Sequence, residues 1–275
     1  MDPLLIMVAP NGARRTKSDH PALPIGPADL AETAAACHAA GAGAIHVHVR
    51  DEAGRHCLDR ARYEEAFAAI RARVGDDMVL QATTEAVGRF SPADQMAAVR
   101  QLEPRAVSIA VRELFAEGED EPRRFLEWAA RQAVAIQWIL YDSGDFRRYL
   151  ELVRLGAIPA AEPGNVLFVL GRYAVGQESS PADLEPYLRI LREEGEEGRL
   201  TWSICAFGRG ETAALRAAME AGGHLRVGFE NSLWEPDGSV AADNAARVRM
   251  IAELARAAGR RLATGAEARA ILGVA

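Results

Sequence analysis

Short runs of apolar residues recur along the chain, and amphipathic stretches separate them. Runs that are apolar at nearly every position are typical of strands buried on both faces of a parallel sheet. The segments between them have helical spacing; Leu30, Ala34 and Cys37, for example, share one face of a helix expected to end at Gly41. We therefore predict eight strands with helices between them. The strands are expected at residues 4–9, 44–49, 78–83, 106–111, 133–140, 165–170, 201–207 and 224–229.

Helix start signals support this division. The segments that begin at Gly26, Ser91 and Ser180 each combine a possible cap, a proline at the first helical position and an aspartate in the first turn. A capping-box pattern at Thr264 predicts a last helix. Because no proline- or glycine-rich linker and no low-complexity tract divides the chain, we expect residues 1–275 to form a single domain.

Eight strand-then-helix units match the size and order of a TIM barrel, the (β/α)8 member of the α/β class. The structural rival is an open doubly wound sheet. Such sheets often carry the dinucleotide fingerprint G-x-G-x-x-G after the first strand, whereas APNGARR follows it here. The pattern therefore predicts a TIM barrel.

Composition and charge narrow the possible functions. The 39 acidic and 32 basic side chains give a formal net charge of -7, which disfavours nucleic acid or an anionic membrane as the main partner. The three cysteines are unclustered and predict neither a disulfide framework nor a cysteine zinc site. Neither a signal peptide nor a membrane span is recognisable, so we expect a cytoplasmic protein that acts on a small molecule.

Active sites of TIM barrels lie at the carboxyl ends of the strands. Solvent begins there in any barrel, but polar residues at all eight ends together favour a polar ligand. In chain order they are Asn11 and Arg14; His46, His48 and Arg50; Thr83, Thr84 and Glu85; Arg112 and Glu113; Tyr141 and Asp142; Arg172 and Tyr173; Arg209; and Arg226, Glu230 and Asn231.

His46 and His48 stand two positions apart in AIHVHVRD, so they project to the same face of the second strand. Two imidazoles can share a metal ion, and a catalytic zinc ion needs a third protein ligand and an open position. Glu230 is the best third candidate, because the last strand of a closed barrel lies close to the second. Arg226 has the parity of Glu230, so it would point inward and need a carboxylate partner. There is a structural alternative for each residue. The histidines could simply occupy a half-buried strand, Glu230 could be a solvated carboxylate that begins a loop, and Arg226 could face the helices.

The loop FGRGE after the seventh strand places Gly208 and Arg209 at the start of a helix, where backbone N–H groups favour an anion. A tight turn into a helix would look the same. The other histidines are interpreted as structural: His20 in a polar loop, His38 on a helix, His56 in a turn and His224 at the start of the last strand.

Several segments together resemble the β-keto acid cleavage enzyme family, best known for 3-keto-5-aminohexanoate cleavage. They are APNGARRTKSDHPALP, AAGAGAIHVHVRDEAGRHCLD, AGGHLRVGFEN, NAARVRMIAELA and ATGAEARAILG, and the resemblance covers essentially the whole chain. It implies a zinc-containing TIM barrel that assembles as a homo-oligomer, a dimer or a tetramer. It also implies condensation of a β-keto acid with acetyl-CoA, releasing acetoacetate and a new acyl-CoA.

In this resemblance the zinc-binding H-x-H of the family falls on His46 and His48, its glutamate on Glu230 and its inward arginine on Arg226. The family commonly follows that glutamate with an aspartate assigned as the general base. This chain has Asn231 there, an amide that cannot accept the proton.

Two other departures concern the same region. Gln137 and Ile139 stand in the fifth strand, where the family usually has a glutamate, and Arg14 stands in the early loop in place of an acid. We therefore seek the base among the carboxylates of neighbouring strand ends, Glu85 and Glu113 first and Asp142 after them. Predicted contacts for the substrate carboxylate or the coenzyme phosphates are Asn11, Arg14, Arg112, Asp142, Arg172, Gly208 and Arg209.

Two other functions stay open. Metal-dependent hydrolase barrels also use H-x-H on a strand, but they usually add histidines on later strands, and the fifth to seventh strands end without one. A barrel that binds a metal and a keto acid without turnover is favoured by Asn231 and the altered fifth strand. The leading hypothesis is a zinc-dependent β-keto acid cleavage enzyme.

Overall fold

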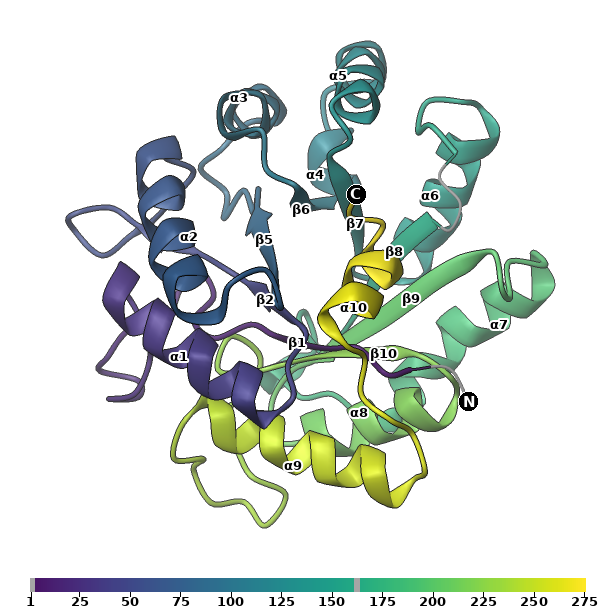
Figure 1. The fold of residues 1–275 in the computed structure, drawn as a ribbon. Helices are drawn as coiled ribbons and strands as arrows, with labels where there is room; N and C mark the ends of the chain where they lie inside the picture. The colour runs from purple at the N-terminus through teal and green to yellow at the C-terminus, as the bar shows by residue number, and fades with distance from the viewer. Residues whose placement is uncertain (1–2, 161–163) are drawn as a thin grey trace.

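Eight parallel strands close into a barrel at the centre of the computed structural model, which describes residues 3–160 and 164–275 (Figure 1). The strands follow the order β1-β10-β9-β8-β7-β6-β5-β2, and β1 closes the sheet by pairing with both β10 and β2. The predicted TIM barrel is therefore confirmed. The barrel strands are β1 (Ile6–Val8), β2 (Ala44–His46), β5 (Val79–Thr83), β6 (Ala106–Ala110), β7 (Ala135–Leu140), β8 (Gly164–Leu170), β9 (Leu200–Ala206) and β10 (His224–Val227).

Helices cover the outside of the barrel (Figure 1), and several begin where the sequence indicates. Ser91 and Thr264 each cap a helix through a capping box, whereas the segment after Ser180 begins with a short 3-10 helix. Within the described ranges, no helix is long and apolar enough to cross a membrane. The helices are α1 (Pro27–Ala40), α2 (Arg60–Val74), α3 (Pro92–Leu102), α4 (Val111–Leu114), α5 (Asp120–Arg131), α6 (Ser143–Arg154), η1 (Val175–Gln177), η2 (Pro181–Leu184), α7 (Glu185–Glu193), α8 (Glu211–Glu220), α9 (Asn244–Ala257) and α10 (Gly265–Leu272).

The second strand is shorter than predicted. β2 ends at His46, and β3 (Val49–Arg50) pairs antiparallel with β4 (His56–Cys57) in a separate hairpin. Between them, the buried amide of Asn11 binds the main chain of His48: it donates to the carbonyl oxygen at 2.9 Å and accepts from the N–H at 3.4 Å. This side chain satisfies the main chain where the regular ladder stops, and the chain is free to turn away.

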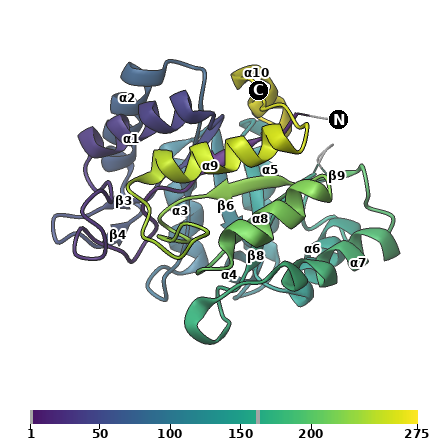
Figure 2. The ribbon, with the colours of Figure 1, turned by 90° about the horizontal axis from the view of Figure 1, so that it is seen from below.

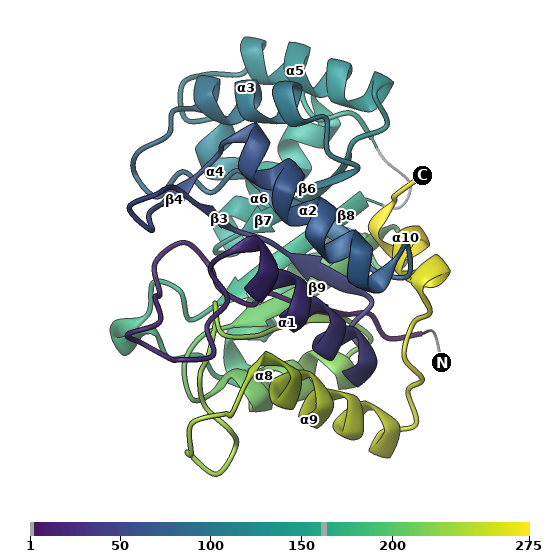
Figure 3. The ribbon, with the colours of Figure 1, turned by 60° about the vertical axis from the view of Figure 1, so that its left-hand side comes forward.

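The two ends of the barrel differ in what covers them. α10 packs across the amino-terminal ends of the strands, where Ala268 and Leu272 join Leu5 and Met7 in one apolar cluster. The β3–β4 hairpin lies at the opposite end, away from both chain termini (Figures 2 and 3). The carboxyl ends of the strands therefore open into loops, as an active-site face requires.

A polar layer crosses the barrel interior between two apolar clusters. On β6 its member is Ser108, which lies between Ala106 of the cluster near α10 and Ala110 of the cluster near the mouth. Gln81 on β5 and Gln137 on β7 are equally buried, and they hydrogen-bond to each other across β6 at 3.2 Å. Side chains on strands that are not neighbours can meet in this way only inside the barrel.

Candidate metal centre

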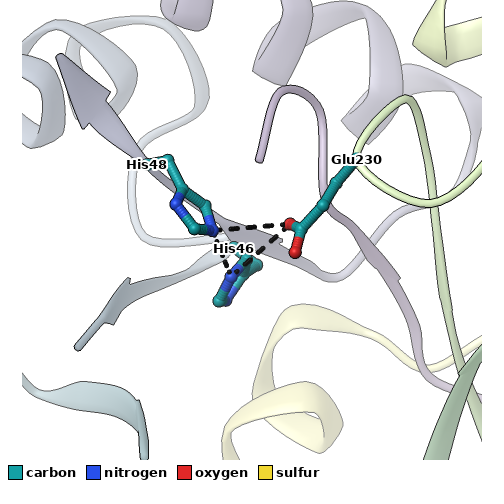
Figure 4. A group of neighbouring side chains, drawn as sticks. All are labelled: His46, His48 and Glu230. Atoms are coloured by element: carbon teal, nitrogen blue, oxygen red, sulfur yellow. Dashed lines mark hydrogen bonds and ion pairs between the residues drawn. The ribbon is translucent and has the colours of Figure 1, made fainter. Parts of the chain in front are cut away.

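The three predicted metal ligands meet at the mouth of the barrel (Figure 4). His46 ends β2, His48 lies two residues further, and Glu230 follows β10, which β1 alone separates from β2. The Nε2 atoms of His46 and His48 are 3.1 Å apart, and each lies 3.6 Å from Oε2 of Glu230. The structure thus brings together side chains from opposite ends of the chain.

The arrangement of these atoms fits a bound divalent cation. Oε2 of Glu230 is buried and has no hydrogen-bond partner among the described residues, a costly state for a carboxylate oxygen without a cation beside it. Two ligands at zinc distances in a tetrahedron lie about 3.3 Å apart. The separations of 3.1 and 3.6 Å are close to that value. Three protein ligands leave a fourth position for a substrate or water.

Arg226 holds the third ligand from below. Its Nη2 donates to Oε1 of Glu230 at 3.2 Å and to Sγ of Cys205 at 3.3 Å, so the inward arginine has the carboxylate partner that the sequence required. Burial opposes ionisation of Glu230, but the positive charges of Arg226 and, after it, Arg172 hold the pKa of Glu230 below its ordinary value. Glu230 is therefore a carboxylate, with one oxygen turned toward the histidines.

The two histidines are in the form that binds metals. Burial lowers the pKa of His46 to about 4, and burial together with neighbouring His56 lowers the pKa of His48 well below its ordinary value. Both imidazoles are consequently neutral at pH 7 and offer a nitrogen lone pair without first losing a proton.

Gly12 allows Glu230 to lie where it does. Its φ is +63°, and a Cβ added there would lie 2.6 Å from Cγ of Glu230. A glycine is therefore required on two grounds, the left-handed backbone and the close approach of the ligand side chain. The loop that follows β1 therefore packs against the side chain of Glu230 at Gly12.

A cavity of about 100 Å³ is lined by Glu230 and by Glu85. Oε2 of Glu85 lies 3.8 Å from Nε2 of His48. Burial, and after it the charge of Glu230, raises the pKa of Glu85 to about 7. Glu113, the other favoured base, instead turns its carboxylate to the Ala86 N–H and the Gln95 amide. Of the two, Glu85 is the one placed beside the ligands.

Three arginines line the same cavity: Arg14, Arg15 and Arg172. Arg14 is exposed at the rim, whereas the guanidinium of Arg172 lies over the ring of Phe207, 5.3 Å from its centroid. The positive charge of Arg172 lowers the pKa values of both Glu85 and Glu230. The cavity wall therefore places three arginines beside the carboxylates of Glu85 and Glu230.

The structure gives two other predicted substrate contacts partners of their own. Arg112 donates through Nε to Asp145 at 2.8 Å and through Nη2 to Asp142. Its guanidinium also lies 5.2 Å from the ring centroid of Tyr141. Arg112 and Asp142 thus balance each other's charge.

The anion position predicted at Gly208 and Arg209 is filled by the chain itself. The N–H of Arg209 donates to Oε2 of Glu178 at 2.7 Å, and a Cβ on Gly208 would lie 2.4 Å from the same oxygen. The guanidinium of Arg209 lies over Trp234, 3.8 Å from the ring centroid. The start of α8 does attract an anion, and in this structure the anion is a glutamate side chain.

Asn231 is completely buried directly after Glu230. Both its amide nitrogen and its amide oxygen lack a hydrogen-bond partner among the residues that the structure describes. Its main chain, by contrast, is bonded on both sides, to Gly228 and to Gly208. The side chain therefore retains its full capacity to donate and accept next to Glu230, the third candidate ligand.

Sequence reasoning missed the residues behind the histidines. His56, interpreted as structural, has its Nδ1 at 3.3 Å from Nδ1 of His48, because Arg50↔His56 pairing in the β3–β4 hairpin folds it back over that ring. Oε1 of Gln81 lies 2.7 Å from Nδ1 of His46. A glutamine within an otherwise apolar buried run was the available signal, since such a group needs a partner.

Comparison with known proteins gives a family match over nearly the entire chain. The model of the beta-keto acid cleavage enzyme family matches residues 3–274. A 3-keto-5-aminohexanoate cleavage enzyme of Fusobacterium nucleatum is 30% identical over 277 residues, covering 99% of this chain and 98% of that protein. A 3-oxoadipate:acetyl-CoA acetyltransferase of Cupriavidus necator is 28% identical, covering 99% of this chain and 95% of that protein.

Among solved structures, the apo structure of ObcA superposes with a TM-score of 0.71 at 18% sequence identity. The match covers 92% of this chain and 66% of that longer one. At this identity the likeness concerns the fold, and it agrees with the closed barrel described above.

Proposed function

The chain belongs to the beta-keto acid cleavage enzyme family, and we propose that it condenses a β-keto acid with acetyl-CoA at a zinc ion held by His46, His48 and Glu230. The products would be acetoacetate and the acyl-CoA of the substrate's remaining acyl group. The observation that carries this proposal is the buried, unpartnered oxygen of Glu230, which faces two neutral imidazole nitrogens.

In the proposed reaction, the carbon between the keto group and the carboxylate loses a proton and attacks the acetyl thioester. When bound, a zinc ion would stabilise the enolate oxygen as a Lewis acid. The chain itself supplies a neutral imidazole pair, a carboxylate held by Arg226, and a cavity that Glu230 lines. Subsequent cleavage of the original carbon–carbon bond transfers the remaining acyl group to CoA.

We assign the general base to Glu85. It lines the cavity and lies beside His48, and a pKa near 7 suits proton abstraction near neutral pH. Glu113 is occupied by Ala86 and Gln95, and Asp142 is paired with Arg112. Geometry therefore favours Glu85 over the other carboxylates considered.

The arginines of the cavity wall support an anionic substrate. Arg14, Arg15 and Arg172 line the cavity, and their positive charges would attract a carboxylate of the keto acid or a phosphate of CoA. Arg14 is the exposed member and therefore the one free to reach a second carboxylate at the far end of a substrate. We infer a preference for keto acids that carry a negative charge at that end.

The test is to incubate the purified protein with acetyl-CoA and a panel of β-keto acids and to measure acetoacetate, with metal content determined by mass spectrometry. We expect stoichiometric zinc and turnover of at least one dicarboxylic member. Glu85→Gln should lower kcat by at least about a hundredfold. Glu113→Gln, a matched change on the next strand end, should leave most activity. Equal losses in both variants would refute the assignment of the base.

Asn231 supports a second candidate, a barrel that binds a metal and a keto acid without turnover, because an unpartnered amide stands directly beside the ligand Glu230. In that case the wild-type protein would bind zinc and a keto acid yet release no acetoacetate across the panel. Gain of acetoacetate production in Asn231→Asp would then identify the missing carboxylate as the cause.

A further inference from the structure

Three buried amides connect His46 with the helix at the opposite end of the barrel. Nδ1 of His46 lies 2.7 Å from Oε1 of Gln81, and Nε2 of Gln81 donates to Oε1 of Gln137 at 3.2 Å. Nε2 of Gln137 donates to Oδ1 of Asn165 at 2.9 Å. Nδ2 of Asn165 donates to the main-chain carbonyl of Ile271 at 3.0 Å, in the last turn of α10.

The main-chain carbonyl of Ile271 determines which group donates and which accepts in every hydrogen bond of the series. The Ile271 oxygen can only accept, so Asn165 must present its NH2 group to it and its oxygen to Gln137. Gln137 is thereby oriented in the same sense, and Gln81 after it. Oε1 of Gln81 is left facing His46 as an acceptor, which requires the proton on Nδ1.

A second, shorter series acts on the other histidine. Nε2 of His56 lies 3.1 Å from the main-chain carbonyl of Glu85 and must donate to it. A neutral His56 then has its lone pair on Nδ1, which lies 3.3 Å from Nδ1 of His48. His48 must therefore donate from Nδ1. The two series come from different strands, yet both end on a carbonyl oxygen that cannot donate.

We propose that these two series, anchored on the carbonyls of Ile271 and Glu85, fix the tautomers of His46 and His48 so that both Nε2 lone pairs face the metal position. Gln81, Gln137, Asn165 and His56 are on this view positioning residues. The inference rests on the metal site of the proposed function. The tautomers themselves, however, are properties of the metal-free protein.

Metal binding requires a free lone pair on Nε2 of each histidine, and the distances between the ligand atoms do not show whether it is there. A neutral imidazole carries its proton on either nitrogen. A proton on Nε2 of His46 or His48 would let one ring donate to the other across the 3.1 Å between these two atoms, and it would point at the cation. Hydrogen bonds to the second ring nitrogen commonly select the binding tautomer, and their loss costs about 10- to 100-fold in metal affinity. For His46, the group that selects the tautomer is the main-chain carbonyl of Ile271. Three side chains separate this carbonyl from the imidazole ring.

The principal test records imidazole 15N chemical shifts in the metal-free full-length protein. In the wild type, His46 and His48 should each show one tautomer, protonated on Nδ1. Gln137→Met keeps the side-chain volume but breaks the longer series, so Gln81 can rotate and His46 should become a mixture of tautomers. His48 should not change. An unchanged His46 in Gln137→Met would overturn the proposal.

His56→Phe supplies the reciprocal case, because it retains a ring while removing the acceptor. His48 should then become a mixture and His46 stay single. Ser108→Ala is the matched control: its hydroxyl is buried in the same layer, without a hydrogen-bond partner among the described residues, and stands outside both series. Ser108→Ala should leave both tautomers unchanged. If it changed the His46 tautomer ratio as much as Gln137→Met does, the effect would not depend on the hydrogen-bonded series.

A rescue variant separates orientation from packing. An ionised glutamate at position 81 can only accept, so Gln81→Glu combined with Gln137→Met, measured at a pH at which this carboxyl is ionised, should restore the single His46 tautomer although the series remains broken. Failure of this rescue would show that Gln137 acts through packing. Should Gln137→Met fail to fold, Asn165→Leu breaks the same series at its far end.

Zinc affinity, measured by competition with a chromophoric chelator, should fall about tenfold in Gln137→Met and His56→Phe and stay at the wild-type value in Ser108→Ala. These measurements distinguish the two ideas. Absence of zinc binding in the wild type would refute the proposed metal site, whereas wild-type binding with unaltered tautomers in the variants would refute the series alone.

Discussion

Gly12→Ala is a small change that should weaken metal binding although all three candidate ligands stay in place in the sequence. The added methyl group would have to occupy a point 2.6 Å from Cγ of Glu230, on a backbone with φ of +63°. Two effects follow, a local strain in the loop and a displacement of the carboxylate. They differ in magnitude and can be measured separately.

The strain should be modest and the displacement decisive. A left-handed conformation costs a non-glycine residue about 1–2 kcal/mol. Ordinary contact begins at 3.4 Å, so Cγ of Glu230 must retreat by about 0.8 Å from its separation of 2.6 Å. Metal–ligand distances tolerate only about 0.2 Å. We therefore expect zinc affinity to fall by at least about tenfold, beyond any loss of stability.

Gly156→Ala is the matched control, because Gly156 has a φ of +67° and an added Cβ would meet no atom within 4 Å. Urea titration should show similar losses of about 1–2 kcal/mol in both variants, while chelator competition should show weaker zinc binding in Gly12→Ala alone. Wild-type affinity in Gly12→Ala would refute the close-approach argument. An equal fall in both variants would show that strain alone is responsible.

Three further predictions concern charge. Arg226→Met leaves the buried carboxylate of Glu230 without its cation, so the metal-free variant should lose about 3–5 kcal/mol of unfolding free energy in urea, and added zinc should recover part of it; an unchanged midpoint would contradict the pairing. Arg14→Glu should lower kcat/KM for a dicarboxylic keto acid at least about fivefold relative to a monocarboxylic one, and an unchanged ratio would remove Arg14 from substrate selection. Burial raises the pKa of Glu211 to about 7 from 4.5, against the opposing effect of Arg247. The folded state therefore holds this proton more tightly, and the unfolding free energy should fall as pH rises between these values; Glu211→Gln should remove that part of the slope in urea titrations, and an equally steep slope would count against it.

The fold was predictable because its main signal is local. Each barrel strand is buried on both faces, and the apolar runs record this directly; the run 165–170, for example, became β8 with one residue added at its start. The exception is informative. The run 44–49 is continuous in hydrophobicity, yet the barrel strand ends at His46, because Asn11 binds the main chain of His48. A contact between residues 37 positions apart leaves no trace in the pattern of either segment.

The convergence of the three candidate ligands was predictable for a related reason. Parity along a strand places His46 and His48 on one face, and closure of the barrel brings the end of β10, with Glu230, close to β2. Pairing of charged side chains was not predictable in this way. Arg112 stands at a strand end as expected, but Asp145 and Asp142 neutralise it, and a strand end gives no information about such partners.

The residues behind the candidate ligands were predictable only in part. The sequence shows that buried amides are present, but not how they pair. Gln81 and Gln137 each interrupt an apolar run and Asn165 begins one, all at buried positions, and a buried amide without partners is costly enough to require some hydrogen bond. The interruptions therefore predict a polar layer inside any barrel that these runs form. Which atom faces which cannot be read from the chain, because the order of donors and acceptors depends on the anchoring carbonyl of Ile271, contributed by a helix from the far end of the sequence. If that anchor orients His46, the chemistry at the mouth of the barrel depends on how its opposite end is closed, and truncating α10 should weaken metal binding at a site that the helix does not touch.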